Sequence, residues 1–153
     1  MATIYSDPLV RARAGRNLLS HEYLGKLRVA EWEFAALPVG NIGDVLVLGR
    51  FRNGERMLHG SMVHTAAGAG TFDIGTYAIT ATGDLGAVIT QALFVSGLAG
   101  ATTTVEAFPE AAELPAAAGR VLATADVFVC ITNIGTAFTT SARFSGYYVV
   151  VGD

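Results

Sequence analysis

Hydrophobic and polar positions alternate over short runs through the middle and the C-terminal part of the chain, as they do in half-buried β-strands. Such runs cover 26–34, 45–51, 57–64, 71–79, 102–105, 121–132 and 141–151. In the first run the apolar positions change from odd to even numbers between Val29 and Trp32. This change of phase predicts a β-bulge at 30–31, because a bulge inserts one extra residue into a strand.

Turn signals separate these runs. Residues 37–44 combine Pro, Gly, Asn and Asp, and residues 66–70 consist of Ala and Gly. Asn53-Gly54 lies between two apolar runs, and both central residues of a type I′ turn need the positive φ that Asn and Gly tolerate. We therefore expect a β-hairpin that joins 45–51 to 57–64.

The segment 84–98 follows a different pattern. Its apolar residues recur at helical spacing, and residues 82–84 resemble a helix cap. The residues with this spacing are Val88, Ile89, Ala92, Leu93 and Val95. The pattern predicts a short helix or a helical loop.

The short runs, the regular turn signals and eighteen glycines favour an all-β fold over an α/β fold. We expect an antiparallel β-sandwich or jelly-roll-like domain over residues 26–153, with at most a short helix. Residues 1–25 are expected to form an extended N-terminal arm, because no alternation long enough for a core strand precedes Leu27. A chain of 153 residues is long enough for one domain with a sizeable core.

Charged residues make up 15% of the chain and the mean hydropathy is +0.46, whereas ordinary soluble domains carry about 25% charged residues. This deficit excludes intrinsic disorder, a basic nucleic-acid binder and a charge-rich coiled coil, and it predicts a homo-oligomer. We expect no secretory signal and no membrane helix, since no positive start precedes an apolar run and no apolar run of about 18 residues is free of charge and glycine. The single cysteine, Cys130, is expected to be a small buried residue of a protein made in the cytosol.

Basic residues are concentrated at the N-terminus. Eight of the ten lie within the first 56 positions, where six acidic residues accompany them. A solvated terminus is one interpretation, an arm that docks on an acidic partner or a sister subunit is a second, and nucleic-acid binding is a weak third. If the arm docks on a partner, its apolar anchors and its ion-pairing arginines are the candidate contact residues. They are Ile4, Tyr5, Leu9, Arg11, Arg13, Arg16, Leu18, Leu19 and Tyr23.

Candidate catalytic or metal-binding residues are sparse. Glu31 and Glu33 share a strand face and are expected to be solvated, since glycoside hydrolysis needs carboxylates across a cleft. His59 and His64 are expected on opposite faces of one strand, and no Cys or His stands at metal-ligand spacing from them. No recognisable catalytic, phosphate-binding or calcium-binding motif includes the remaining candidates. These are His21, Gly68-Ala69-Gly70, Ser61, Ser96, Asp73 and Asp84. We therefore expect no catalytic site, no metal and no cofactor.

Several segments follow a familiar layout: Gly49-Arg50-Phe51, Glu55-Arg56-Met57-Leu58-His59-Gly60, His64-Thr65, Thr71-Phe72-Asp73-Ile74-Gly75-Thr76-Tyr77 and Tyr147-Tyr148-Val149-Val150-Val151. The layout covers about two thirds of the chain. It resembles that of small capsid decoration or cement proteins of tailed double-stranded DNA bacteriophages. The resemblance implies a β-sandwich trimer that binds the major capsid protein on the exterior of the head shell. The single cysteine, the charge balance and the lack of a long apolar run separately lead us to expect synthesis in the host cytoplasm and no specific nucleic-acid or membrane partner.

Two other functions remain open from the sequence. The first is a carbohydrate- or ligand-binding β-sandwich module of a phage neck or tail component. Its stacking platform would come from Trp32, Tyr77, Tyr147 and Tyr148, although aromatic residues this few usually serve a core or an interface. The second is a polysaccharide-active enzyme or esterase, which the missing motifs disfavour.

Overall fold

The computed structural model describes residues 3–5, 27–34, 41–58, 61–66, 70–99, 104–108, 120–122, 124–138 and 143–151. These ranges contain strands and turns and no helix, hence none that could span a membrane. The strands are β1 (Thr3–Tyr5), β2 (Leu27–Phe34), β3 (Val45–Phe51), β4 (Arg56–Leu58), β5 (Ser61–Ala66), β6 (Thr71–Ile79), β7 (Leu85–Ala99), β8 (Thr104–Phe108), β9 (Arg120–Leu122), β10 (Val127–Asn133) and β11 (Arg143–Val151).

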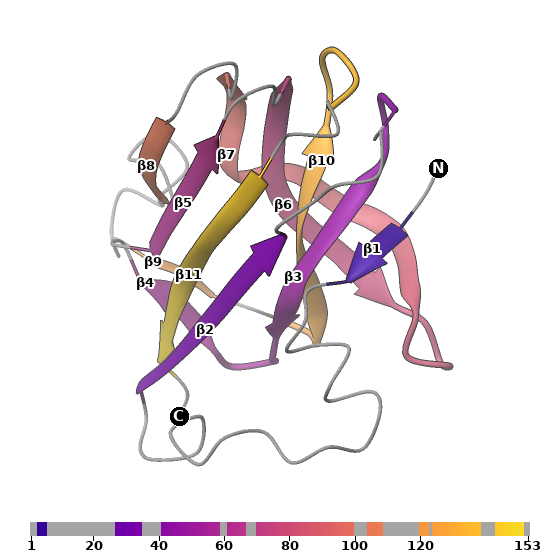
Figure 1. Ribbon diagram of the computed structural model, residues 1–153. Helices are drawn as coiled ribbons and strands as arrows, with labels where there is room; N and C mark the ends of the chain where they lie inside the picture. The colour runs from indigo at the N-terminus through magenta and orange to yellow at the C-terminus, as the bar shows by residue number, and fades with distance from the viewer. Residues whose placement is uncertain are drawn as a thin grey trace.

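The strands form two sheets that pack face to face (Figure 1). The five-stranded sheet has the order β1-β3-β10-β6-β7, and the six-stranded sheet has the order β8-β5-β11-β4-β9, with β2 paired to β11 as well. All pairs are antiparallel except β1 with β3, which is parallel. The predicted all-β sandwich is confirmed.

The main core lies between the sheets and is filled by alternate residues of their facing strands. Phe72 of β6 and Phe144 of β11 meet edge to face, with ring centroids 5.3 Å apart and an interplanar angle of 81°. Phe51 and Phe94 make a similar contact within the five-stranded sheet, at 6.0 Å. Such edge-to-face pairs add to the stabilisation that burial of the rings provides.

The five-stranded sheet is buried on its outer face too. A second cluster of buried side chains, here called the outer cluster, lies there: Val45, Val47, Tyr77, Phe128 and Cys130, with Ile79 and Leu85 packed against it. Burial on both faces explains why β3 and β10 are almost continuously apolar. Cys130 is free and fully buried, as expected, and desolvation raises the pKa of its thiol.

The predicted helix at 84–98 is wrong, because this segment is the long strand β7. The register between β6 and β7 shifts at four places. Three of the shifts place one extra residue of β7 against β6, and the shift between Ile74 and Thr76 places three. These extra residues break the two-residue period of a regular strand. A strand with several such irregularities presents apolar residues at intervals of three and four, which imitates a helix.

The predicted bulge in β2 is also wrong. All eight residues of β2 pair with β11 in one continuous register, so the even-numbered residues face inward throughout. Arg28 occupies one of these inward positions because its guanidinium is ion-paired with Glu55 at 2.6 Å. Val29 consequently faces outward and is 39% exposed.

The Asn53-Gly54 turn forms but does not make a hairpin. The N–H of Glu55 donates to the carbonyl of Arg52 at 3.0 Å, and Gly54 has a φ of +84°. The strands on either side, β3 and β4, belong to different sheets, so the turn is a corner of the sandwich. The predicted strands 57–64 and 121–132 are each split into two, β4 with β5 and β9 with β10.

Candidate interaction surface

The predicted docking arm is largely outside the described residues. Tyr5 ends β1, where its backbone pairs with that of Val47. The other predicted arm residues lie outside the described ranges: Leu9, Arg11, Arg13, Arg16, Leu18, Leu19 and Tyr23. His21 and His59 lie outside them as well.

The four aromatic residues of the suggested stacking platform do not come together on a surface. Trp32 and Tyr148 are buried in the main core, and Tyr77 is buried in the outer cluster. The Tyr148 hydroxyl donates to the Arg50 carbonyl at 2.9 Å, and the Tyr77 hydroxyl is bonded to Thr132 Oγ1 at 2.8 Å. Burial raises the pKa of both tyrosines. Tyr147 is exposed, at 38%.

Polar side chains cross the outer face of the six-stranded sheet in a row. Ser145 of β11 stands opposite Glu33 of β2 on one side and His64 of β5 on the other. Glu31 and Glu33 are exposed, as expected. A nucleophilic relay needs the histidine between the serine and the carboxylate, whereas here the serine is in the middle. In the described part of the chain, no group of three His, Cys, Asp or Glu residues could hold a metal ion.

Asp73 and Gly75 of β6 fix the course of β7. The buried Asp73 carboxylate accepts hydrogen bonds from Gln91 Nε2 and from the backbone N–H of Gly97, both at 2.8 Å. Gly75 lies directly against the carbonyls of Thr90 and Gln91, where a Cβ atom would collide with backbone. These two residues thus hold the irregular part of β7 in place.

The β6–β7 hairpin extends away from the other strands, as its salmon end at the lower right of Figure 1 shows. Its turn is closed on itself, since Thr80 N–H donates to the Asp84 carbonyl at 2.9 Å and Asp84 N–H donates to Thr80 Oγ1 at 3.0 Å. Thr82 Oγ1 also donates to the Asp84 carboxylate at 3.0 Å. The tip is therefore a well-hydrogen-bonded turn.

β7 is the edge of the five-stranded sheet, and among the described residues only β6 pairs with it. Residues 85–105 contain no Asp, Glu, Lys, Arg or His. Val88 and Ile89 of this strand are 49% and 56% exposed. Natural proteins usually protect an edge strand with charges, proline or a covering segment, so an uncharged edge with exposed aliphatic residues is a candidate interaction surface.

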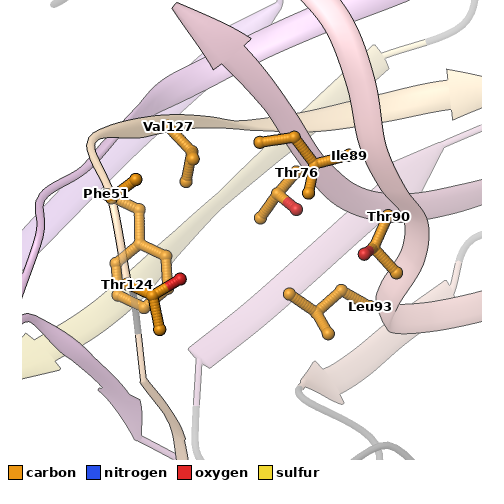
Figure 2. A pocket seen from close by; sticks show the side chains of 8 residues that line it. Phe51, Thr76, Ile89, Thr90, Leu93, Thr124 and Val127 are labelled. Atoms are coloured by element: carbon orange, nitrogen blue, oxygen red, sulfur yellow. The ribbon is translucent and has the colours of Figure 1, made fainter.

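A pocket of about 190 Å³ opens beside this edge. Figure 2 shows the side chains that surround it. They come from four segments that are distant in sequence: Phe51, Thr76, Ile89, Thr90, Leu93, Thr124, Ala125 and Val127. None of these eight side chains is titratable, so they offer apolar and hydroxyl contacts rather than acid–base or metal chemistry.

The helical spacing of apolar residues at 84–98 assigned most of β7 to a helix. The signal that could have identified the surface is the length of the uncharged stretch, 85–105, between Asp84 and Glu106. The pocket itself has no such signal, because its lining is brought together by the packing of β3, β6, β7 and the 124–127 segment.

No protein-family model and no curated protein matches the sequence. Among solved structures, the fold is similar to a chain from the capsid of Ralstonia phage GP4, with a TM-score of 0.70 and 13% sequence identity. The match covers 99% of this chain and 99% of that chain. The two chains therefore share one fold from end to end.

Proposed function

We propose that this protein is a virion structural protein that decorates and stabilises a bacteriophage head shell. In this proposal it binds the major capsid protein on the exterior of the shell as a homotrimer, after synthesis in the host cytoplasm. Its role is structural rather than catalytic, and it needs neither cofactor nor metal.

The observation that carries the proposal is the end-to-end similarity in fold to a chain of a phage capsid. A match over the full length of both chains is better support than a match to one shared subdomain. The low charge content and the uncharged edge of β7 agree with it, because a shell-bound protein buries apolar surface against its neighbours.

The N-terminal arm is proposed to bind the shell. Its three arginines, Arg11, Arg13 and Arg16, would pair with acidic groups of the major capsid protein, and its aliphatic and aromatic residues would anchor it. Paired charges of this kind mainly set orientation and the association rate. Their contribution should therefore weaken as salt screens them.

The test is saturation binding of the purified protein to head shells that were assembled without it from the major capsid protein of the same genome. Saturable binding at a fixed ratio of copies to capsid subunits, with increased resistance of the heads to heat, is the expected result. No binding by the intact trimer at low and high ionic strength would contradict the proposed function.

A matched pair of variants tests the arm. The variant Arg11→Ala/Arg13→Ala/Arg16→Ala should bind heads more weakly than the parent at low salt, and the difference should shrink at high salt. The control Arg50→Ala/Arg52→Ala/Arg143→Ala removes the same charge from exposed positions of the sandwich and should bind as the parent does. Equal effects of the two variants would argue against a specific arm site.

A further inference from the structure

β2 is an edge strand of the six-stranded sheet, because among the described residues only β11 pairs with it. Its outward-facing residues Val29, Glu31 and Glu33 are all exposed. Neither carboxylate forms a hydrogen bond or an ion pair with a described residue. The free edge of β2 therefore presents one aliphatic side chain and two unpaired negative charges, at intervals of two residues.

One segment of the N-terminal arm has the complementary pattern. Residues 9–13 have the sequence Leu-Val-Arg-Ala-Arg, and alternate residues of an extended backbone share a face. The leucine and the two arginines therefore match the aliphatic–acidic–acidic order of β2 with opposite charge. The valine and the alanine would lie on the inward side of β2, where Ala30 and Trp32 are apolar. The same order of apolar and basic residues recurs at 24–28 and 48–52, but those runs contain residues of β2 and β3 themselves.

We propose that residues 9–13 add to the free edge of β2 in the same chain, as a parallel strand, while the protein is not bound to a shell. The register brings together the pairs Leu9–Val29, Arg11–Glu31 and Arg13–Glu33. The inference deepens the proposed function, on which it rests for the contact between arm and shell. Two of the arginines that would bind the shell are held on the protein's own acidic edge until acidic groups of the shell compete for them.

The direction of the added strand follows from the aliphatic pair. Antiparallel addition would also bring the two arginines opposite the two glutamates, but it would place Gly15 opposite Val29. Oppositely charged pairs and apolar pairs directly across a sheet both stabilise it, so the parallel direction satisfies all three positions. Addition of an extended segment to a sheet edge is an established mode of recognition, in which backbone hydrogen bonds provide affinity and side chains provide specificity.

The lengths of the flanking segments agree with an occupant from the same chain. Residues 14–26 would connect the added strand to β2, and parallel neighbours need a connection of about a dozen residues or more. β1 ends at Tyr5, which pairs with Val47 of β3. Three positions further along β3, the Arg50 carbonyl accepts from the Arg28 guanidinium of β2 at 3.1 Å, so β1 ends close to the start of β2. A segment tethered in this way has an effective concentration of about millimolar, far above that of a second copy in dilute solution.

Disulfide formation tests the contact in the purified protein. Arg11→Cys/Glu31→Cys should form a disulfide within one chain under oxidising conditions, detected by non-reducing electrophoresis and peptide mapping. The matched control is Arg11→Cys/Val88→Cys, because Val88 is 49% exposed and lies on β7, at the opposite edge of the five-stranded sheet from β1. The buried Cys130 is present in both proteins. We expect at least tenfold more disulfide in the first variant.

Three results of this experiment would overturn the proposal. Equal yields in the two variants would show no preference for β2. Disulfides only between chains would identify a second copy as the occupant. A higher yield in Arg11→Cys/Glu33→Cys than in Arg11→Cys/Glu31→Cys would show the antiparallel register.

Hydrogen exchange provides a measurement that does not depend on thiols. Glu31→Gln/Glu33→Gln should remove protection from the amides of residues 9–13, whereas Asp84→Asn/Asp126→Asn, which removes two carboxylates elsewhere, should leave it unchanged. Arg11→Glu/Arg13→Glu should also remove this protection, and Glu31→Arg/Glu33→Arg in the same chain should restore it. Protection that is absent from the parent, or that the reversed charges do not restore, would overturn the proposal.

Binding to head shells separates the inference from the proposed function. Only an arm that has left β2 can bind the shell, so the docked population weakens the apparent affinity by the fraction of free arms. Glu31→Gln/Glu33→Gln should therefore bind heads at least about threefold more tightly than the parent at low salt. Unchanged or weaker binding by this variant would overturn the inference. Heads that bind neither protein, although the disulfide within the chain forms, would overturn the proposed function alone.

Discussion

The carboxylate of Asp73 in β6 accepts a hydrogen bond from the backbone N–H of Gly97 in β7, at 2.8 Å and 24 positions further along the chain. The other carboxylate oxygen accepts from the Gln91 side chain. Because both acceptors are used, Asp73 holds β7 at two points of its irregular course. Together with the close approach of Gly75 to the carbonyls of Thr90 and Gln91, this buried carboxylate holds the edge strand in its irregular course.

Replacing Asp73 should loosen β7. Asp73→Ala removes two hydrogen bonds to a charged group, each of which contributes about 1.5–3 kcal/mol before the exposure of the Gly97 donor reduces it. We therefore expect the free energy of unfolding to fall by about 2–4 kcal/mol in urea denaturation. Asp73→Asn keeps one acceptor and should cost less. The control Asp126→Asn affects an exposed carboxylate that accepts a hydrogen bond from the Asn53 N–H, and it should cost less than about 1 kcal/mol. Equal losses of unfolding free energy for Asp73→Asn and Asp126→Asn would show that Asp73 does not hold β7 in place.

Gly75 should tolerate no side chain. In Gly75→Ala the new Cβ meets the backbone carbonyls of Thr90 and Gln91, so β7 must move, and we expect a loss of about 3 kcal/mol or more. Gly83→Ala at the hairpin turn is the control, because that site has open space and only its φ of +83° is unfavourable, at about 1–2 kcal/mol. Hydrogen exchange should show lost protection along β7 in the first variant only. Unchanged protection along β7 in Gly75→Ala would show that the position of β7 does not depend on Gly75.

The ion pair of Arg28 and Glu55 should show coupling. Glu55 also accepts from the Arg52 N–H at 2.7 Å, and the two paired side chains are 19% and 10% exposed. Removing one partner leaves the other charge poorly solvated, so Arg28→Met and Glu55→Gln should each lower the free energy of unfolding by about 2–3 kcal/mol. The loss is smaller than for a fully buried pair, because both side chains are partly exposed. The double variant should cost at least about 1 kcal/mol less than the sum. If the double variant loses the sum of the two single losses in unfolding free energy, measured with denaturant, the two residues are not energetically coupled.

Alkaline pH should destabilise the fold through its buried thiol and tyrosines. Burial raises the pKa of Cys130 above its ordinary value of 9.0, and the pKa values of Tyr77 and Tyr148 above 10.0. Below about pH 8 both the folded and the unfolded chain keep these protons, so stability is unaffected. As pH rises through 9 and 10, the unfolded chain loses them first, and the free energy of unfolding falls.

The comparison for this pH dependence is Cys130→Ala, followed by denaturation from pH 7 to 10.5. The variant is expected to be less stable than the parent at pH 7, because it leaves a cavity, but to lose less stability between pH 8 and 10. Parallel curves for parent and variant would show that the thiol does not contribute.

Strands whose hydrophobic pattern matches their burial in the sandwich are predicted well from the sequence. β3 and β6 follow the apolar runs at 45–51 and 71–79 to the residue, because both are flanked by turn residues and buried along most of their length. β2 was predicted with a false bulge, since Arg28 faces inward to reach Glu55, a partner that local sequence does not reveal.

β7 and the pocket needed the tertiary structure. The irregular register of β7 depends on Asp73 and Gly75 of another strand, so its own residues imitate a helix. Residues 85–105 did contain a usable signal in their lack of charge. The interaction of the arm with a shell stays a prediction, since most of its residues lie outside the described ranges.

Electron cryomicroscopy of head shells before and after addition of the purified protein tests the central proposal most directly. The proposed function predicts added density on the exterior of the shell, at symmetry-related positions, into which three copies of the two-sheet sandwich fit at each site. A shell without added density, or density confined to the neck or tail, would contradict it.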